Sequence, residues 1–184
     1  MRSLSNWISR LSTGRVALAA LLAFLLFMIF VLPGQAGQAE AVSAGVGSPD
    51  TTFFYSTADL YAMAEAYGAS GRADYIRARF TFDLIFPLVY GIFLLTSVSW
   101  LATRAFEETS SSRLLNLVPG FGMLFDFLEN GAASLVMARY PLETAVVDVL
   151  APVFSVLKWF FLGVAFLLLF ILGFYRLFRR RTSS

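Results

Sequence analysis

Four long apolar runs, separated by segments that carry arginine, constrain the fold of this 184-residue chain more than any other feature. A helix that crosses about 30 Å of hydrocarbon needs about 20 consecutive, mostly apolar residues. The runs approach or exceed this length and predict membrane spans at about residues 16–32, 80–103, 114–138 and 149–175. The sequence therefore predicts an all-α membrane protein, a single domain over residues 1–184, built as a bundle of four transmembrane helices.

The composition excludes a soluble globule and several kinds of chemistry. Hydrophobic residues make up 58% of the chain and charged residues only 14%, whereas a soluble domain carries about 25% charged residues. The chain has no cysteine and no histidine. Disulfides, thiolate or imidazole metal sites and histidine-based catalytic triads are therefore excluded. We expect no metal and no cofactor.

The first apolar run has an alternative interpretation as a signal peptide. Small residues follow it in the segment Gln35–Ala39, where a signal peptidase could cut. Its 17 apolar residues, Val16 to Leu32, exceed the usual signal-peptide core of about 7–15 residues, which favours a membrane span. The other three spans are the same under either interpretation.

The distribution of arginine predicts the orientation. Nine arginines fall on one side of the predicted membrane and four on the other. The positive-inside rule then places both termini in the cytoplasm, and we expect a multi-pass protein of the bacterial inner membrane. The C-terminal cluster of Arg176, Arg179, Arg180 and Arg181 indicates an anchor that attracts anionic lipid. Membrane lipids are therefore expected partners, nucleic acid is not, and the sequence identifies no protein partner.

The segment between the first two spans, residues 33–79, predicts an extracytoplasmic helical element. Ser56 can cap a helix whose first turn holds Asp59, and Gly68 can end it. Between them, apolar residues recur at helical spacing at Leu60, Met63, Ala64 and Tyr67. This amphipathic helix, at about residues 57–67, either packs on the bundle at the membrane surface or forms a lid over a binding site.

Four ionisable residues fall inside predicted spans: Asp83, Asp126, Glu129 and Lys158. Such residues cost several kcal/mol each and usually face the interior of a bundle or a water-filled cavity. The predicted helices at 114–138 and 149–175 form a hairpin. When one residue of each helix lies at the same depth, the sum of their two residue numbers is therefore constant.

The residue numbers of two opposite-charge pairs have the same sum: Glu129 with Lys158, and Arg139 with Asp148. One antiparallel register therefore predicts both ion pairs. At a rise of about 1.5 Å per residue, the Glu129–Lys158 pair would lie about 15 Å below the outer boundary.

A candidate ligand-binding site follows from these positions. Asp126 and Glu129 share one helix face, and Asn130 lies one step away. Tyr90 falls near the depth of Glu129, and Asp83 lies close enough to Arg77 and Arg79 to pair with one of them. The candidate site comprises Asp83, Tyr90, Asp126, Glu129, Asn130 and Lys158, with apolar walls from Phe86, Phe125, Phe127 and Trp159.

Three functions remain open for this site. Its three acids and one lysine carry a formal charge of −2, so it would hold protons or take a cationic or hydroxyl-bearing group in preference to an anion. The first hypothesis is a protein that binds a lipid-like or amphipathic small molecule. The second is a membrane-embedded enzyme in which Asp126 or Glu129 is a general acid or base, although no catalytic residue is identified. The third is a structural or accessory subunit in which the polar network only fixes helix packing.

Four motifs together resemble a widespread group of bacterial four-span membrane proteins that has no assigned biochemical function. They are Y-x-M-x-E-x-Y-G-x-x-G-R from Tyr61 to Arg72, Asp83-Leu84-Ile85-Phe86-Pro87, Asp126-Phe127-Leu128-Glu129-Asn130 and Leu157-Lys158-Trp159. This resemblance covers most of the chain from Phe54 onward. It implies four helices with an outer helical segment, and it implies no catalytic role.

A more distant similarity is architectural, to the emopamil-binding and sigma-2 receptor superfamily. Those proteins have four core spans, a long first outer connection and acidic residues that face a sterol-like ligand. The similarity is one of architecture and not of motifs. The absence of histidine here departs from a sterol-isomerase mechanism.

Overall fold

The computed structural model describes residues 1–43 and 45–181, with residues 179–181 as backbone. The described residues form helices and connecting loops without a β-strand, which confirms the all-α class. Three of the four arginines in the predicted C-terminal anchor lie outside the described side chains, so that prediction stays untested.

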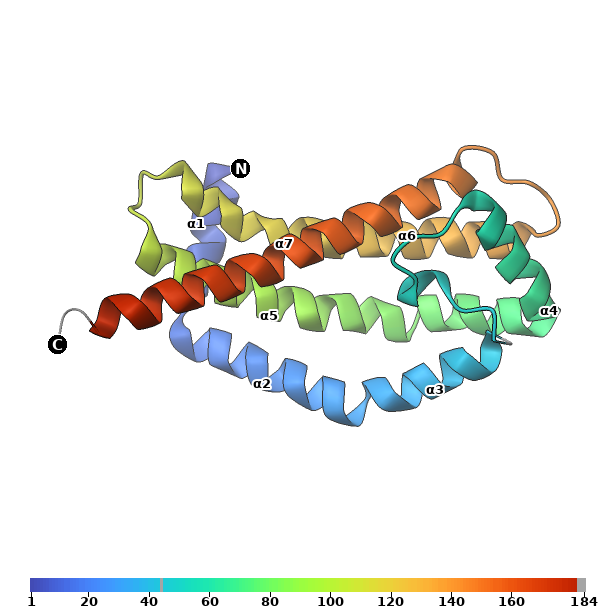
Figure 1. Cartoon of the computed structure of the whole chain (residues 1–184), viewed down its shortest axis with the longest axis horizontal. Coiled ribbons are helices and arrows are strands. Elements are labelled where there is room, and N and C mark those ends of the chain that lie inside the picture. The colour runs from blue at the N-terminus through green and yellow to red at the C-terminus, as the bar shows by residue number, and fades with distance from the viewer. Residues whose placement is uncertain (44, 182–184) are drawn as a thin grey trace.

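Four long helices run along the long axis of the molecule (Figure 1). They are α2 (Gly14–Phe30), α5 (Phe82–Ala105), α6 (Val118–Arg139) and α7 (Val147–Arg181). Each contains most of one predicted apolar run. The first residues of the third run instead belong to the 3-10 helix η2 (Ser111–Leu117), and α6 begins next to Pro119, a residue suited to a first helical turn.

Two helical stretches are long and apolar enough to cross a membrane, namely Thr57–Ala105, which contains α5, and Val147–Phe178 within α7. A third candidate is the pair formed by α1 (Arg2–Leu11) and α2, which are bent by 83° at their junction. These helices support a membrane protein with two or three crossings by length and composition alone.

The segment between α2 and α5, which we call the outer segment, contains more helix than the sequence predicts. Pro33 lies in the first turn of a further helix, α3 (Leu32–Val42), so the chain continues as helix beyond α2. Helix α4 (Thr57–Arg79) starts where the sequence predicts, because Ser56 and Asp59 form a capping box. At Gly68 the backbone leaves the helical conformation, with φ 61°, so α4 consists of two helices joined at a kink, and the first of them ends where the sequence predicts.

The predicted apolar stripe of α4 packs on the bundle. Leu60 and Ala64 are fully buried, and Met63 and Tyr67 nearly so. They form one hydrophobic cluster with Ala132, Ala133, Val136 and Met137 of α6. Helix α4 therefore covers the C-terminal half of α6.

Helices α6 and α7 approach closely at Gly122. A Cβ atom at this position would lie 3.1 Å from Leu162 Cδ2 and 3.5 Å from the Leu162 backbone nitrogen. Gly122 shares the buried face of α6 with Asp126, Glu129 and Asn130. The small residue thus lets the charged face of α6 lie directly against α7.

Asn116 of η2, just before α6 begins, joins three elements. Its Nδ2 donates to Ser5 O, Ser9 Oγ and Ser99 Oγ, each at 3.1 Å, and its Oδ1 accepts from Ser5 Oγ at 2.8 Å. Both Asn116 and Ser5 are buried. The amide therefore fixes α1 to η2 and α5.

We expect Asn116→Ala to lower the free energy of unfolding by about 1–3 kcal/mol, because it leaves buried hydroxyl and carbonyl groups without a partner. Tryptophan fluorescence during SDS titration of the micelle-embedded protein would measure the change. Asn6→Ala is the matched control, since Asn6 is exposed on α1. Equal effects of the two variants would contradict a special role for Asn116.

Candidate functional site

The structure brings the predicted intramembrane charges together. Lys158 Nζ of α7 lies 2.5 Å from Glu129 Oε2 and 3.8 Å from Asp126 Oδ1, both on α6. Glu129 is 0% exposed and Lys158 3%. The predicted Glu129–Lys158 pair is therefore confirmed, and with it the antiparallel register of α6 and α7.

The second ion pair of that register does not form in the described structure. Arg139 is exposed, and Asp148 Oδ2 accepts a hydrogen bond from Tyr61 Oη at 3.2 Å instead. The same hydroxyl accepts from the Thr144 backbone nitrogen at 2.8 Å. Helix α4 lies over the α6–α7 connection. The partner of Asp148 is therefore Tyr61 of α4 and not the predicted Arg139.

Asp126 receives hydrogen bonds from two further candidate residues. Tyr90 Oη of α5 donates to Asp126 Oδ2 at 2.6 Å, and Asn130 Nδ2 donates to Asp126 Oδ1 at 3.4 Å. The sequence places Tyr90 at the depth of Glu129, but its hydroxyl bonds to the neighbouring carboxylate. Asp126 thus connects α5 to the lysine on α7.

Asp83 belongs to a second ion group. Arg79 Nη2 lies 2.9 Å from Asp83 Oδ2, and Arg79 Nη1 pairs with Asp50 Oδ1 of the 3-10 helix η1 (Pro49–Thr51). Arg77 instead pairs with Asp74 at 3.1 Å on the exposed surface. Of the two predicted partners of Asp83, the structure selects Arg79. The sequence analysis missed Asp50, which lies in a connection without a periodic pattern.

The two ion groups interact electrostatically and form one buried unit. Arg79 interacts with Asp126 and Glu129, and Asp83 interacts with Lys158. We call this unit the polar centre; its charged members are Asp50, Asp83, Asp126, Glu129, Arg79 and Lys158. Four carboxylates and two cations give it a formal charge of −2.

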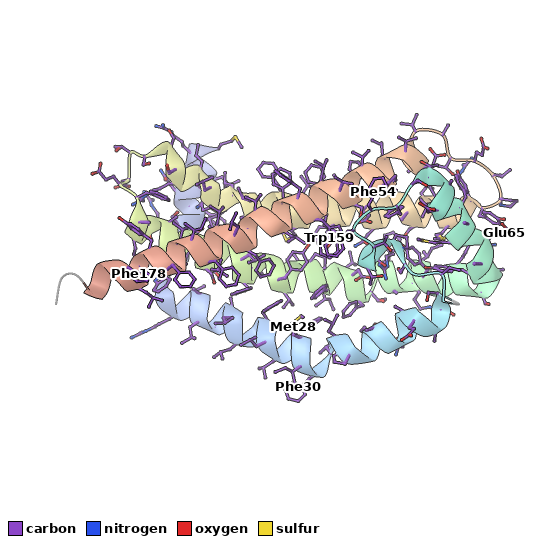
Figure 2. The ribbon with its side chains drawn as sticks, in the orientation of Figure 1. Met28, Phe30, Phe54, Glu65, Trp159 and Phe178 are labelled. Atoms are coloured by element: carbon purple, nitrogen blue, oxygen red, sulfur yellow. The ribbon has the colours of Figure 1, made fainter. Side chains whose placement is uncertain are left out.

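A tyrosine from the outer segment reaches the polar centre. Tyr55, between η1 and α4, is 1% exposed, and its Oη donates to Glu129 Oε1 at 3.1 Å. Two residues earlier, the Phe53 ring lies 4.5 Å from the ring of Trp159, which Figure 2 labels on α7. Burial, and then the negative charge of Glu129, raise the pKa of Tyr55, so its hydroxyl stays protonated and donates. The sequence pattern does not predict Tyr55 as a member of the site.

We expect Tyr55→Phe to lower the free energy of unfolding by about 1.5–3 kcal/mol, because it removes a buried hydrogen bond to a charged group. The measurement is again SDS titration followed by fluorescence. Tyr140→Phe is a suitable control, because Tyr140 contacts Arg72 through its ring. A loss no larger than that of the control would mean that the Tyr55–Glu129 bond contributes little.

Several buried polar atoms around the polar centre have no hydrogen-bond partner among the described residues. They include Tyr75 Oη, Asn130 Oδ1, Ser134 Oγ and Trp159 Nε1. The Arg79 guanidinium lies 4.6 Å from the centre of the Tyr75 ring, which places Tyr75 beside the polar centre. Each such group costs about 1–3 kcal/mol if it stays unpaired, and buried polar groups in proteins are otherwise paired, often with bound water. These atoms can bind a polar group.

A hollow lies beside Tyr55. It has a volume of about 230 Å³, and its lining includes Phe54, Tyr55, Asp59 and Met63. Tyr55 therefore lines the hollow and also bonds to Glu129 of the polar centre.

No group of three or more acidic side chains in residues 1–43 and 45–181 is placed to hold a metal ion.

The chain matches no protein-family model, no curated protein and no solved structure.

Proposed function

We propose that α2, α5, α6 and α7 all cross the bacterial inner membrane, with both termini in the cytoplasm. At about 1.5 Å per residue, the 17 residues of α2 and the 22 of α6 extend about 26 and 33 Å, close to the thickness of the hydrocarbon layer. The charged residues of α6 lower its mean hydropathy, but Asp126 and Glu129 are buried against α5 and α7. Because these two carboxylates face the other helices, the surface of α6 that would face lipid stays apolar.

We propose that the protein binds a lipid-like or amphipathic small molecule and that the polar centre takes its polar group. The observation that carries this proposal is the set of buried polar atoms without a hydrogen-bond partner at the polar centre, above all Tyr75 Oη and Asn130 Oδ1. In an apolar surrounding such atoms favour a bound polar group. The hollow beside Tyr55 supports access from the extracytoplasmic side.

The charge of the polar centre defines the chemistry of the ligand. A formal charge of −2 favours an ammonium or hydroxyl group over a phosphate or carboxylate. Aromatic rings nearby suit the apolar part: Phe86 contacts Tyr90 edge-on at 5.4 Å, and Phe125 stacks on Phe161 at 5.6 Å. The proposed ligand is thus a neutral or cationic amphipath.

A structural role is the second candidate. Each charged side chain of the polar centre has an oppositely charged partner within the chain. Such a network, by itself, can fix the packing of α4, α5, α6 and α7.

Native mass spectrometry separates the two functions. We expect a molecule in stoichiometric amount on the wild type after gentle detergent extraction, and its loss from Glu129→Gln. In this variant Asp126 remains near Lys158, so the bundle should stay folded. Glu65→Gln, on the exposed face of α4, is the matched control and should keep the molecule. Folded wild type and variants that are equally empty would refute ligand binding and favour the structural role.

A further inference from the structure

Helix α1 is oriented differently from every long helix of the bundle. It is bent by 83° from α2, and it crosses the end of the bundle where α2 begins (Figure 1). If α2 crosses the membrane, as proposed above, a helix at nearly a right angle to it lies almost parallel to the membrane plane. The inference below rests on that proposed crossing and not on the proposed ligand.

One side of α1 is fixed to the protein. Ser5 is buried and bonds to Asn116, and Ser9 Oγ accepts from the same amide. The Asn116 amide also bonds to Ser99 of α5. Rotation of α1 about its own axis is therefore prevented, and the directions of its other side chains are set.

The remaining surface of α1 is divided into an apolar and a polar side. Leu4, Trp7 and Leu11 recur at i, i+3 and i+7, so they share one face. They are 52%, 60% and 52% exposed, although they are large and apolar. Asn6 and Arg10 lie on the other side and are also exposed. This division is typical of a helix that lies in a membrane interface.

The charge on α1 and at the start of α2 is entirely positive. Arg2, Arg10 and Arg15 are exposed, and no aspartate or glutamate precedes Glu40 in the sequence. The junction of α1 and α2 lies against Trp100, since a Cβ on Gly14 would come within 2.9 Å of Trp100 Nε1. The Arg104 guanidinium lies 4.4 Å from the centre of the Trp100 ring and adds another cation at this level.

We propose that α1 binds the surface of an anionic phospholipid leaflet. Leu4, Trp7 and Leu11 insert among the upper acyl chains, and Arg10 and Arg15 contact the phosphate groups. Three exposed arginines, in a stretch of the sequence that has no acid before Glu40, match the negative surface potential of such a leaflet. The Asn116 hydrogen bonds hold α1 at the depth that this insertion needs.

Fluorescence quenching in nanodiscs tests the proposal. The Trp100→Phe/Trp159→Phe variant keeps Trp7 as its only tryptophan and is placed in discs of phosphatidylcholine and phosphatidylglycerol. One of the two lipids carries bromine on its acyl chains. We expect Trp7 to be quenched, with about a fivefold preference for brominated phosphatidylglycerol at equal mole fraction. Arg10→Gln/Arg15→Gln should remove the preference while Trp7 stays quenched by either lipid.

A second variant distinguishes failure of this inference from failure of the proposed span. Leu22→Trp, with the three native tryptophans replaced by phenylalanine, reports on an exposed position of α2. If that position is quenched and Trp7 is not, the inference about α1 is overturned and the span is retained. If neither is quenched, both are overturned. Quenching of Trp7 without lipid preference would overturn the anionic part of the proposal. Should the tryptophan-depleted protein not fold, the difference between wild type and Trp7→Phe gives the same information.

Discussion

Lys158→Met is expected to destabilise the bundle by about 3–5 kcal/mol, which is the usual cost of leaving a buried charge without its partner. Methionine keeps an unbranched, apolar chain in place of the aliphatic part of lysine, but the substitution removes the cation 2.5 Å from Glu129 Oε2. Glu129 is fully buried, so water cannot replace the ammonium. Asp126 loses the same cation but keeps its bonds to Tyr90 and Asn130.

A double substitution identifies the cause of that loss. Glu129→Gln/Lys158→Met removes both charges, so it should be less destabilising than Lys158→Met alone. SDS titration with fluorescence detection gives the free energies of unfolding, and Arg139→Met, at an exposed position, should change stability by no more than about 0.5 kcal/mol. If the double variant is as unstable as the sum of the single variants, the buried charge is not the cause.

Arg79→Met is the second substitution with a large expected effect, again about 3–5 kcal/mol. Arg79 is 6% exposed and pairs with both Asp50 and Asp83. Its loss leaves two carboxylates near Asp126 and Glu129 with only Lys158 to offset four negative charges. Because Asp50 belongs to η1, the outer segment should also detach more readily from the bundle.

Hydrogen exchange separates the global and local parts of this effect. We expect residues 49–56 and the second half of α4 to lose protection in Arg79→Met before α6 and α7 do. Arg77→Met is the matched control, because Arg77 lies two residues away with an exposed side chain paired to Asp74. Asp50→Asn/Arg79→Met should recover part of the stability. Uniform loss of protection along the chain would argue against a specific link between Arg79 and the outer segment.

The elements that the sequence predicts well are those with a local, repeating cause. The apolar runs, the Ser56–Asp59 cap and the stripe of α4 depend on helical spacing within one segment. The Glu129–Lys158 pair also followed from the sequence, because two helices joined by a short connection have few possible registers. The predicted Arg139–Asp148 pair does not form, because Tyr61 of α4 bonds to Asp148. The spacing within α6 and α7 gives no information about a side chain of α4.

The remaining members of the site were decided by tertiary contacts. Tyr55 reaches Glu129 over 74 positions of sequence, and Ser5 reaches Asn116 over 111. Asp50 and Tyr55 lie in or beside an irregular connection, where no periodic pattern indicates the direction of a side chain. Hydrophobic spacing by itself determined the four long apolar helices and the buried stripe of α4, but it did not indicate α1 or α3. Which buried groups meet depends on how the outer segment folds back over α6 and α7, because a polar side chain inside the bundle bonds to whichever partner the packing brings within reach.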